Sequence, residues 1–421
     1  MKIELVTIGD ELLLGFTIDT NSAFIARELG EYGISVVRRT TVGDAAEEIA
    51  GAVGEALERT GAVITTGGLG PTADDRTREA IARLFGRELR QDDGVAARLR
   101  AWWERRGRAG GMPASNLVQA LVPEGARVLE NRHGTAPGIW IEDDRGRWVA
   151  MLPGVPRELR GMISDTMIPE LARRAGTAGA GVVRSRTLRT TGISESAVAD
   201  IMSGVEIETP VLSLAYLPGP EGLDLRLTAR GLPADEADVI LTDAAARLRS
   251  LVGRHVYGED ADDLAAVVLD LCRARSMRVA VAESCTGGLL GWRLTAPSGS
   301  SDVFEGGIIA YDNRVKLAQL GVPVADLERD GAVSRSVARA MATGARTRLG
   351  TAIGVGITGV AGPGGGSAEK PVGTVWIAAD VDGEVRDFRG HFVGDRAEVR
   401  WRAAQAALEL LRRMLHADDA D

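Results

Sequence analysis

Short apolar, β-branched runs alternate with amphipathic segments along the first 170 residues of the chain. The runs IELVTIG, SVVRRTTV and AVITT predict strands, and the segments at roughly 19–33 and 45–60 have the apolar spacing of helices. Strands that alternate with helices in this way are typical of a parallel sheet covered by helices on both faces. The pattern therefore predicts a doubly wound α/β domain over residues 1–170.

Around 171–182, the run ARRAGTAGAGV is rich in small residues and has the composition of a linker. Residues 183–253 then predict a strand, a helix, two strands and a helix that begins near residue 234. We expect a small α+β module at this place in the chain.

The alternating pattern restarts at residue 258 and continues to residue 421. A helix (DDLAAVVLDLCRARS) and a buried strand (RVAVA) are followed by a helix to about 295 and the strand GGIIAY. The pattern continues with helices near 314–320 and 334–348 and with the strands TAIGVGIT and GTVWIAAD. A further strand and a helix from about 395 complete the domain. The third domain is therefore also expected to be α/β.

Composition and charge limit the classes of function that this chain can have. A net charge of −9, with no lysine/arginine block, disfavours a nucleic-acid partner. No signal peptide and no apolar stretch of about 18 residues are found, so we expect a cytoplasmic protein without a membrane partner. Two cysteines and four scattered histidines do not make the usual cysteine/histidine zinc clusters.

Lysine is scarce in this chain. Only three of the 50 basic residues are lysine, namely Lys2, Lys316 and Lys370. Arginine stays charged in proteins, whereas lysine becomes a general base once burial or neighbouring cations lower its pKa. A lysine inside a motif therefore invites a chemical interpretation, beside the ordinary one of an exposed helix residue.

The stretch AESCTGG at 282–288 places Ser284, Cys285 and Thr286 where a strand ends and a helix begins. Reactive groups and free backbone N–H donors gather at such places, but serine and threonine there are often only helix caps. Cys285 has no histidine near it in sequence, which favours a small core residue over a thiolate. Lys316 follows the next strand, so adjacent parallel strands would bring Ser284 and Lys316 to one edge of the sheet.

Several other stretches of this domain carry polar or glycine-rich motifs. The turn SGSS, which contains Ser300, is suited either to hydrogen bonds with a polar substrate or to capping the segment that follows it. Tyr311 is suited either to contact with a substrate ring or to filling the core. The segment 354–373 holds a literal G-x-G-x-x-G, but proline and glycine follow it and no helix can open there, so we reject a dinucleotide site. Its backbone N–H groups, including those of Gly362 and Gly364, are suited to an anion or an oxyanion. Arg396, with Arg400, offers a fork to a phosphate or pairs with surface acids.

The N-terminal domain has its own glycine-rich turn, TTGGLGPTADDRT at 65–77. Backbone donors and carboxylates converge there after a buried strand, together with IGDELLLG at 8–15 and VGD at 42–44. This combination suits a phosphorylated ligand held with a divalent metal ion, although acids at a helix start are also ordinary dipole partners. The candidates are Gly67, Gly68, Gly70 and Thr72 for the phosphate, and Asp10, Glu11, Asp74 and Asp75 for the metal.

These motifs together resemble a known family. AESCTGG, SGSS, YDNRVK, GITGVAGPGGGSAEKPVGTVW and GDRAEVR are similar to the nicotinamide-nucleotide amidase domain. TGGLGPTADD, GTAPG and LPGVP are similar to the molybdopterin-binding-like domain. In this order, with a small module between them, they resemble the competence/damage-inducible protein A (CinA) family over essentially the whole chain.

The resemblance implies an activity for each large domain. The family's C-terminal domain converts nicotinamide mononucleotide (NMN) to nicotinate mononucleotide and ammonia without a cofactor, with Ser284 matching the nucleophile and Lys316 the base. Ser300, Tyr311 and, for the phosphate, Arg396 match its substrate contacts. Backbone N–H groups at 285–287, which include Thr286 and Gly287, or in the glycine loop would hold the oxyanion. The N-terminal domain is associated with metal-dependent hydrolysis of ADP-ribose to AMP and ribose 5-phosphate.

Two rival functions stay open from the sequence. One is a binding or transfer protein of the molybdenum-cofactor pathway, which only the first domain supports. The other is a non-catalytic partner protein in competence or recombination, against which the acidic charge weighs. A homodimer is the general expectation for such enzymes.

Overall fold

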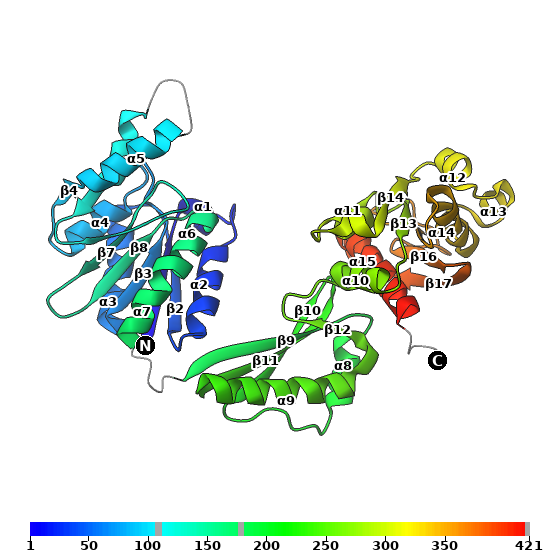
Figure 1. Ribbon diagram of the computed structural model, residues 1–421, viewed down its shortest axis with the longest axis horizontal. Helices are drawn as coiled ribbons and strands as arrows, with labels where there is room; N and C mark the ends of the chain where they lie inside the picture. Colours follow the sequence, from blue (N-terminus) through cyan, green and yellow to red (C-terminus); the bar gives the residue numbers. More distant parts are fainter. Residues whose placement is uncertain (106–111, 176–180, 417–421) are drawn as a thin grey trace. The chain divides into compact units, whose positions relative to one another are not determined.

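The computed structural model describes residues 1–105, 112–175 and 181–416 (Figure 1). Its chain divides into two compact units, Met1–Arg184 with Thr228–Ile240, and Ser185–Leu227 with Leu241–Asp421. Within the described part, no helix is both long and apolar enough to cross a membrane.

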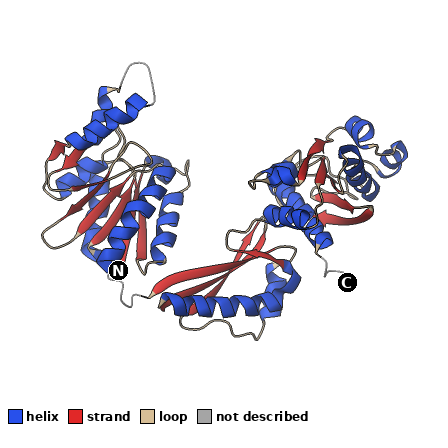
Figure 2. Ribbon diagram, viewed as in Figure 1, coloured by secondary structure: helices blue, strands red, loops and turns tan. Residues whose placement is uncertain are grey.

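A six-stranded sheet forms the centre of the N-terminal domain, with helices on both sides of it (Figure 1, Figure 2). The neighbouring strands β2, β1, β3 and β8 run parallel, and β7 and β6 extend the sheet in antiparallel pairing. In sheet order the strands are β2 (Ser35–Val42), β1 (Lys2–Ile8), β3 (Ala62–Thr66), β8 (Trp148–Leu152), β7 (Gly138–Glu142) and β6 (Arg127–Leu129). Strands β4 (Leu89–Gln91) and β5 (Leu121–Pro123) form a separate pair.

The central strands β1, β3 and β8 are buried, and successive side chains of each point to opposite faces of the sheet. In β1, Ile3 and Leu5 join one apolar cluster, whereas Val6 and Ile8 join another. The first cluster packs under α2 (Thr20–Gly30), α6 (Pro156–Met162), the π-helical turn η2 (Ile163–Met167) and α7 (Ile168–Ala175). The second packs under α3 (Ala46–Thr60) and α4 (Thr77–Leu84). The remaining helices are α1 (Asp10–Leu13), α5 (Asp93–Arg105) and the 3₁₀ turn η1 (Ala114–Ala120).

The middle of the chain forms a four-stranded sheet in the order β10-β11-β9-β12. Its elements are β9 (Val182–Thr190), α8 (Glu195–Met202), β10 (Leu212–Gly219), β11 (Gly222–Leu232), α9 (Ala234–Val252), η3 (Gly253–His255) and β12 (Val256–Glu259). The predicted linker at 171–182 is partly wrong, because α7 continues to Ala175 and β9 begins at Val182. The rest of that prediction, 176–180, lies outside the described residues.

The C-terminal domain is built on a five-stranded sheet in the order β14-β13-β15-β16-β17. Strands β14 (Phe304–Ile309), β13 (Val279–Glu283) and β15 (Ile353–Gly359) are parallel, and β16 (Thr374–Val381) and β17 (Glu384–His391) are antiparallel. The helices are α10 (Leu264–Ala274), α11 (Leu289–Thr295), η4 (Ser300–Asp302), α12 (Asn313–Leu320), α13 (Val324–Asp330), α14 (Arg335–Leu349) and α15 (Arg396–Leu415). Helix α13 was not predicted.

The glycines of the G-x-G-x-x-G sequence lie inside β15, as the rejection of a dinucleotide site requires. An ideal Cβ on Gly354 would lie 2.1 Å from Ala342 O, and one on Gly356 would lie 2.4 Å from Ala338 O. Both oxygens belong to the backbone of α14. These glycines therefore allow close helix–strand packing and bring α14 onto the sheet.

Candidate active site

The AESCTGG stretch lies at the carboxyl end of β13, where the sheet ladder ends. The Ser284 N–H still donates to Ile357 O of β15 at 2.9 Å, which fixes the serine backbone to the sheet. The Ser284 side chain is buried, with 8% of the residue exposed. On the other side, β14 runs parallel to β13 and pairs Ile309 with Glu283. The segments that follow the two strands therefore emerge at the same edge of the sheet.

Lys316 reaches this edge from the first turns of α12. Its Nζ lies 3.1 Å from Ser284 Oγ and donates to Ala310 O at 2.8 Å and to Tyr311 O at 3.1 Å. The residue is 1% exposed, and burial lowers the pKa of its amine, against a smaller opposing effect of the Asp312 charge. These Nζ contacts within the described residues are with a hydroxyl and two carbonyl oxygens, and none is with a carboxylate.

These contacts suit both protonation states of the amine, because an ammonium can donate one N–H bond to each of the three oxygens. A neutral lysine has two N–H bonds and one lone pair. The two carbonyl oxygens, of Ala310 and Tyr311, accept both N–H bonds, which leaves the lone pair for the Ser284 hydroxyl proton. The geometry can therefore orient Lys316 as a base toward Ser284.

A buried carboxylate, which the sequence reasoning did not select, shapes the serine turn. Glu283 is 1% exposed, and its oxygens accept the N–H groups of Gly288 at 3.0 Å, Leu290 at 3.1 Å and Gly291 at 2.8 Å. Glu283 thus satisfies the free donors at the start of α11. Neither Ser284 nor Thr286 caps this helix, because its N-cap is Gly288. The signal available in the sequence was an acid placed just before a predicted helix start.

Cys285 lies in the apolar core beside the serine. It is 5% exposed and belongs to the cluster under α10 and α15. Burial raises the pKa of its thiol to about 12. The thiol is therefore neutral at physiological pH, as the core-residue interpretation expects.

Backbone donors remain free next to Ser284. The Gly287 N–H donates to Ser284 O at 3.1 Å, whereas the N–H groups of Cys285 and Thr286 donate to no backbone carbonyl in the described part of the chain. The Thr286 carbonyl accepts Arg400 Nε at 3.1 Å and Nη2 at 2.7 Å, so Arg400 of α15 fixes the turn. The oxyanion role of the N–H groups at 285–287 stays a prediction.

Arg396 connects the glycine loop to Tyr311. Its Nη1 donates to Gly362 O at 2.6 Å and its Nη2 to Tyr311 Oη at 2.9 Å. It is the first residue of α15, which Asp395 caps by accepting the N–H groups of Ala397 and Glu398. Tyr311 is 59% exposed and does not fill the core. Gly364 has open space where a Cβ would lie.

Ser300 is not brought to this site. It lies in η4, which precedes β14, and the Val303 N–H that follows donates to Ser300 O. The start of β14 pairs with Val279, the first residue of β13. Because the strands are parallel, the loop that enters β14 lies at the opposite edge from the residues that follow it.

In the N-terminal domain, Asp75 organises the glycine-rich turn. Its carboxylate accepts Gly70 N–H at 2.7 Å, Thr72 N–H at 2.8 Å and the Thr72 hydroxyl at 2.5 Å. Gly67 and Gly68 lie directly after β3, with φ of 102° and 64°. The turn has the predicted place at the carboxyl end of a strand, but the Asp75 oxygens are already engaged within it.

Asp10 lies against Asp44 of the VGD stretch. The Asp10 N–H donates to Asp44 at 3.1 Å and the Asp44 N–H to Asp10 at 3.3 Å. Burial raises the pKa of Asp44, and the charges of Asp10, Glu11 and Asp74 raise it further. In residues 1–105, 112–175 and 181–416, however, no three His, Cys, Asp or Glu side chains are grouped so as to hold a metal ion. As arranged, the four predicted carboxylates do not fit a metal ion.

The chain matches three protein families in order. These are described as "Probable molybdopterin binding domain" (residues 4–173), "Damage-inducible protein CinA KH domain" (185–258) and "CinA C-terminal domain" (261–415). It is similar to a CinA-like protein of Gemmatimonas aurantiaca, 58% identical over 100% of this chain and 98% of the relative. A CinA-like protein of Salinibacter ruber is 43% identical over 99% of this chain and 100% of the relative.

Among solved structures, a competence/damage inducible protein of Agrobacterium tumefaciens is 42% identical. The match covers 35% of this chain and 91% of that chain, with a TM-score of 0.35. The full-length relatives and the three ordered family matches lead to one conclusion. The chain belongs to the CinA family, as a competence/damage-inducible protein with an N-terminal molybdopterin-binding-like domain.

Proposed function

We propose that the C-terminal domain hydrolyses the carboxamide of NMN to nicotinate mononucleotide and ammonia, with Ser284 as nucleophile and Lys316 as base. The observation that carries the proposal is the 3.1 Å contact between Lys316 Nζ and Ser284 Oγ in a buried setting. The resemblance of the motifs to the amidase domain supplies the substrate.

In the first half of the reaction, Lys316 Nζ takes the Ser284 proton while Oγ attacks the carboxamide carbon. The carbonyl oxygen becomes an oxyanion, for which the free N–H groups of Cys285 and Thr286 are the nearest backbone donors in sequence. The protonated Lys316 then gives its proton to the amide nitrogen. The C–N bond breaks, ammonia leaves, and an ester joins Ser284 to the nicotinate carbonyl.

In the second half, water attacks this ester while Lys316 takes one of its protons. The bond from Ser284 Oγ to the carbonyl carbon breaks, and the proton on Lys316 returns to Oγ. The product is the carboxylic acid, which ionises to nicotinate mononucleotide. No cofactor enters either half.

Arg396 and Tyr311 are the proposed contacts to the nucleotide. The Arg396 guanidinium has five N–H donors, and the structure uses two of its nitrogens for Gly362 O and Tyr311 Oη. Its positive charge at the start of α15 favours a phosphate. The exposed ring of Tyr311 offers a surface for the substrate ring.

The test is incubation of the purified full-length chain with NMN while ammonia and nicotinate mononucleotide are measured. Nicotinamide riboside and nicotinamide serve as carboxamides without the phosphate. We expect turnover of NMN with a much higher kcat/KM than for either compound. No ammonia from NMN would contradict the proposal, and equal kcat/KM for all three would contradict the phosphate contact alone.

For the N-terminal domain we infer hydrolysis of ADP-ribose to AMP and ribose 5-phosphate. The support is the family resemblance and the place of Gly67, Gly68 and Asp10 at the carboxyl ends of β1 and β3. No step is assigned to a metal ion, because the carboxylates do not fit one as arranged. The test measures the formation of AMP from ADP-ribose, with and without a divalent metal ion. It compares the wild type with Asp10→Asn. No AMP under either condition would contradict it.

A further inference from the structure

A cavity of about 480 Å³ lies in the second unit, away from the Ser284 turn. Two turns of the middle sheet, 191–195 and 218–223, form one side of it. Phe388 of β17, Phe392 and one face of α15 form the other side. This volume lies within the roughly 300–1,000 Å³ of small-molecule sites.

Helix α15 gives the cavity a long, continuous wall. The residues that line it recur at the spacing of one helical face, namely Arg402, Gln405, Ala406, Glu409, Leu410 and Arg413. The eleven steps from the first to the last correspond to about 16 Å of helix. An elongated ligand of several heavy atoms can therefore lie along this face.

The walls offer flat apolar surfaces. Phe388 is 46% exposed although it lines the cavity, and Leu223 opposite is almost fully buried. The Phe392 ring lies over Gly390, where an ideal Cβ would be 2.5 Å from the ring atom Cζ. Exposed aromatic faces in a recess suit a ring, which gains both burial and ring contact.

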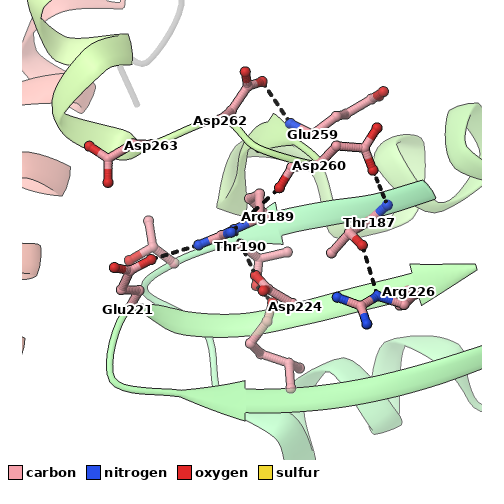
Figure 3. Close-up of polar contacts among 12 residues, drawn as sticks. Thr187, Arg189, Thr190, Glu221, Asp224, Arg226, Glu259, Asp260, Asp262 and Asp263 are labelled. Carbon is pink, nitrogen blue, oxygen red and sulfur yellow. Dashed lines mark hydrogen bonds and ion pairs between the residues drawn. The ribbon is translucent and has the colours of Figure 1, made fainter. Parts of the chain in front are cut away.

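The acids of the cavity are largely neutralised within the protein. Glu409 has 8% of its side chain exposed and binds Arg412 Nε at 2.7 Å and Arg413 Nε at 2.6 Å. Glu221 binds Arg189 Nη2 at 2.6 Å, a contact drawn in Figure 3. Glu195 is exposed at the start of α8.

Arg402 differs from these residues. In the described part of the chain its guanidinium forms no ion pair and no hydrogen bond, although it lines the cavity. Arg402 is half-buried and lies beside apolar walls, so an anion that reaches its guanidinium forms a charge-assisted hydrogen bond there.

We propose that this cavity binds a small organic anion that carries a flat apolar ring, with the ring against Phe388 and Phe392 and the anionic group at Arg402. Two elements that form its walls continue toward the candidate active site. Helix α15 begins with Arg396, and the Phe392 N–H donates to Gly373 O, at the base of the glycine loop, at 2.9 Å. The ligand site itself does not depend on the proposed amidase activity.

The test uses the full-length chain and the fluorescent aromatic anion 8-anilinonaphthalene-1-sulfonate. We expect one saturable site for each chain. Arg402→Gln removes the positive charge and Phe388→Ala removes an apolar wall, so each weakens binding about tenfold or more. The matched controls are Arg348→Gln, an exposed arginine of α14, and Phe16→Ala, a phenylalanine that is 81% exposed in the other unit. Both controls should bind as the wild type does.

Ala406→Trp fills the cavity from the helix wall and should abolish binding without removing a polar group. Circular dichroism and thermal melts show which variants keep the fold. AMP and nicotinate, added as separate competitors, distinguish a phosphate from a carboxylate as the anionic group. Displacement by either supports the proposal. Probe binding that survives Arg402→Gln, Phe388→Ala and Ala406→Trp in folded protein, or displacement by neither competitor, overturns it.

Discussion

Lys316 and Ser284 come from segments that follow two neighbouring parallel strands, and their side chains meet with Nζ 3.1 Å from Oγ. The serine turn begins where β13 ends, and the lysine helix begins after β14 at the same edge of the sheet. Because both side chains are buried, the proton that they would exchange is shielded from bulk water.

The acid limb of the pH profile should report Lys316. Burial lowers the pKa of its amine, and only the neutral amine can accept the serine proton. We expect kcat/KM for NMN to fall as the pH falls through this lowered pKa and to level off above it. The measurement is initial rates from about pH 5 to pH 10. A kcat/KM that stays constant down to about pH 5 would contradict the role of a neutral lysine.

Lys316 should also make stability depend on pH. Its folded pKa lies below the unfolded one, so between the two values the unfolded chain binds more protons and stability rises with pH. The stability gained in Lys316→Met, relative to wild type, should therefore be larger at pH 7 than above pH 10. Urea unfolding at both pH values measures it. A pH-independent difference would contradict the lowered pKa.

Glu283 should act by holding the serine turn. Glu283→Ala leaves three N–H donors at the start of α11, one buried and two partly buried, without their acceptor, so we expect a loss of about 2–3 kcal/mol in the free energy of unfolding. Glu283→Gln keeps one acceptor oxygen and should lose less. Denaturant unfolding of both variants tests this. Equal stability of Glu283→Ala and wild type would show that the three hydrogen bonds do not support the turn.

Arg396 should affect substrate binding more than the chemical step. Arg396→Lys keeps a positive charge but cannot hold Gly362 O and Tyr311 Oη with one planar fork. We expect KM for NMN to rise about tenfold, with a smaller effect on kcat. Tyr311→Phe, which removes one partner of the fork, should have the weaker effect of the two. A large fall in kcat with an unchanged KM would place Arg396 in the reaction itself.

The glycines of β15 should matter for packing. Gly356→Ala places a methyl group 2.4 Å from Ala338 O on the α14 backbone, so we expect about 1–3 kcal/mol of destabilisation. Gly364→Ala is the control, because no atom lies within 4 Å of its Cβ position. Thermal melts of both variants should show a lower Tm only for Gly356→Ala. Equal Tm values would contradict the close contact.

Sequence reasoning predicted the alternating fold well, because buried strands and amphipathic helices leave strong periodic signals. It also placed Ser284 and Lys316 at one sheet edge, since the direction of parallel strands follows from their order. Helix α13 is only seven residues long, from Val324 to Asp330, and has no strong pattern. Whether such a short helix forms is decided by its packing against neighbouring elements.

The details of the site depended on hydrogen bonds that spacing does not reveal. Ser300 was selected for its hydroxyl group, but strand direction carries it to the opposite edge. Asp75 was selected as a metal ligand, but its carboxylate closes its own turn. Glu283 was not selected, although it stands just before a predicted helix start, because that position alone does not show that a carboxylate is buried. Each difference concerns where a polar side chain finds its partner.

The central claim is that Ser284 attacks the carboxamide and Lys316 takes its proton. The most direct measurement compares NMN turnover in wild type, Ser284→Ala, Lys316→Met and Cys285→Ala, each checked for its fold. We predict loss of turnover in the serine and lysine variants and continued turnover in Cys285→Ala. Retained turnover in Ser284→Ala, or loss of turnover in a folded Cys285→Ala, would contradict the claim and point to the cysteine or to another residue as the nucleophile.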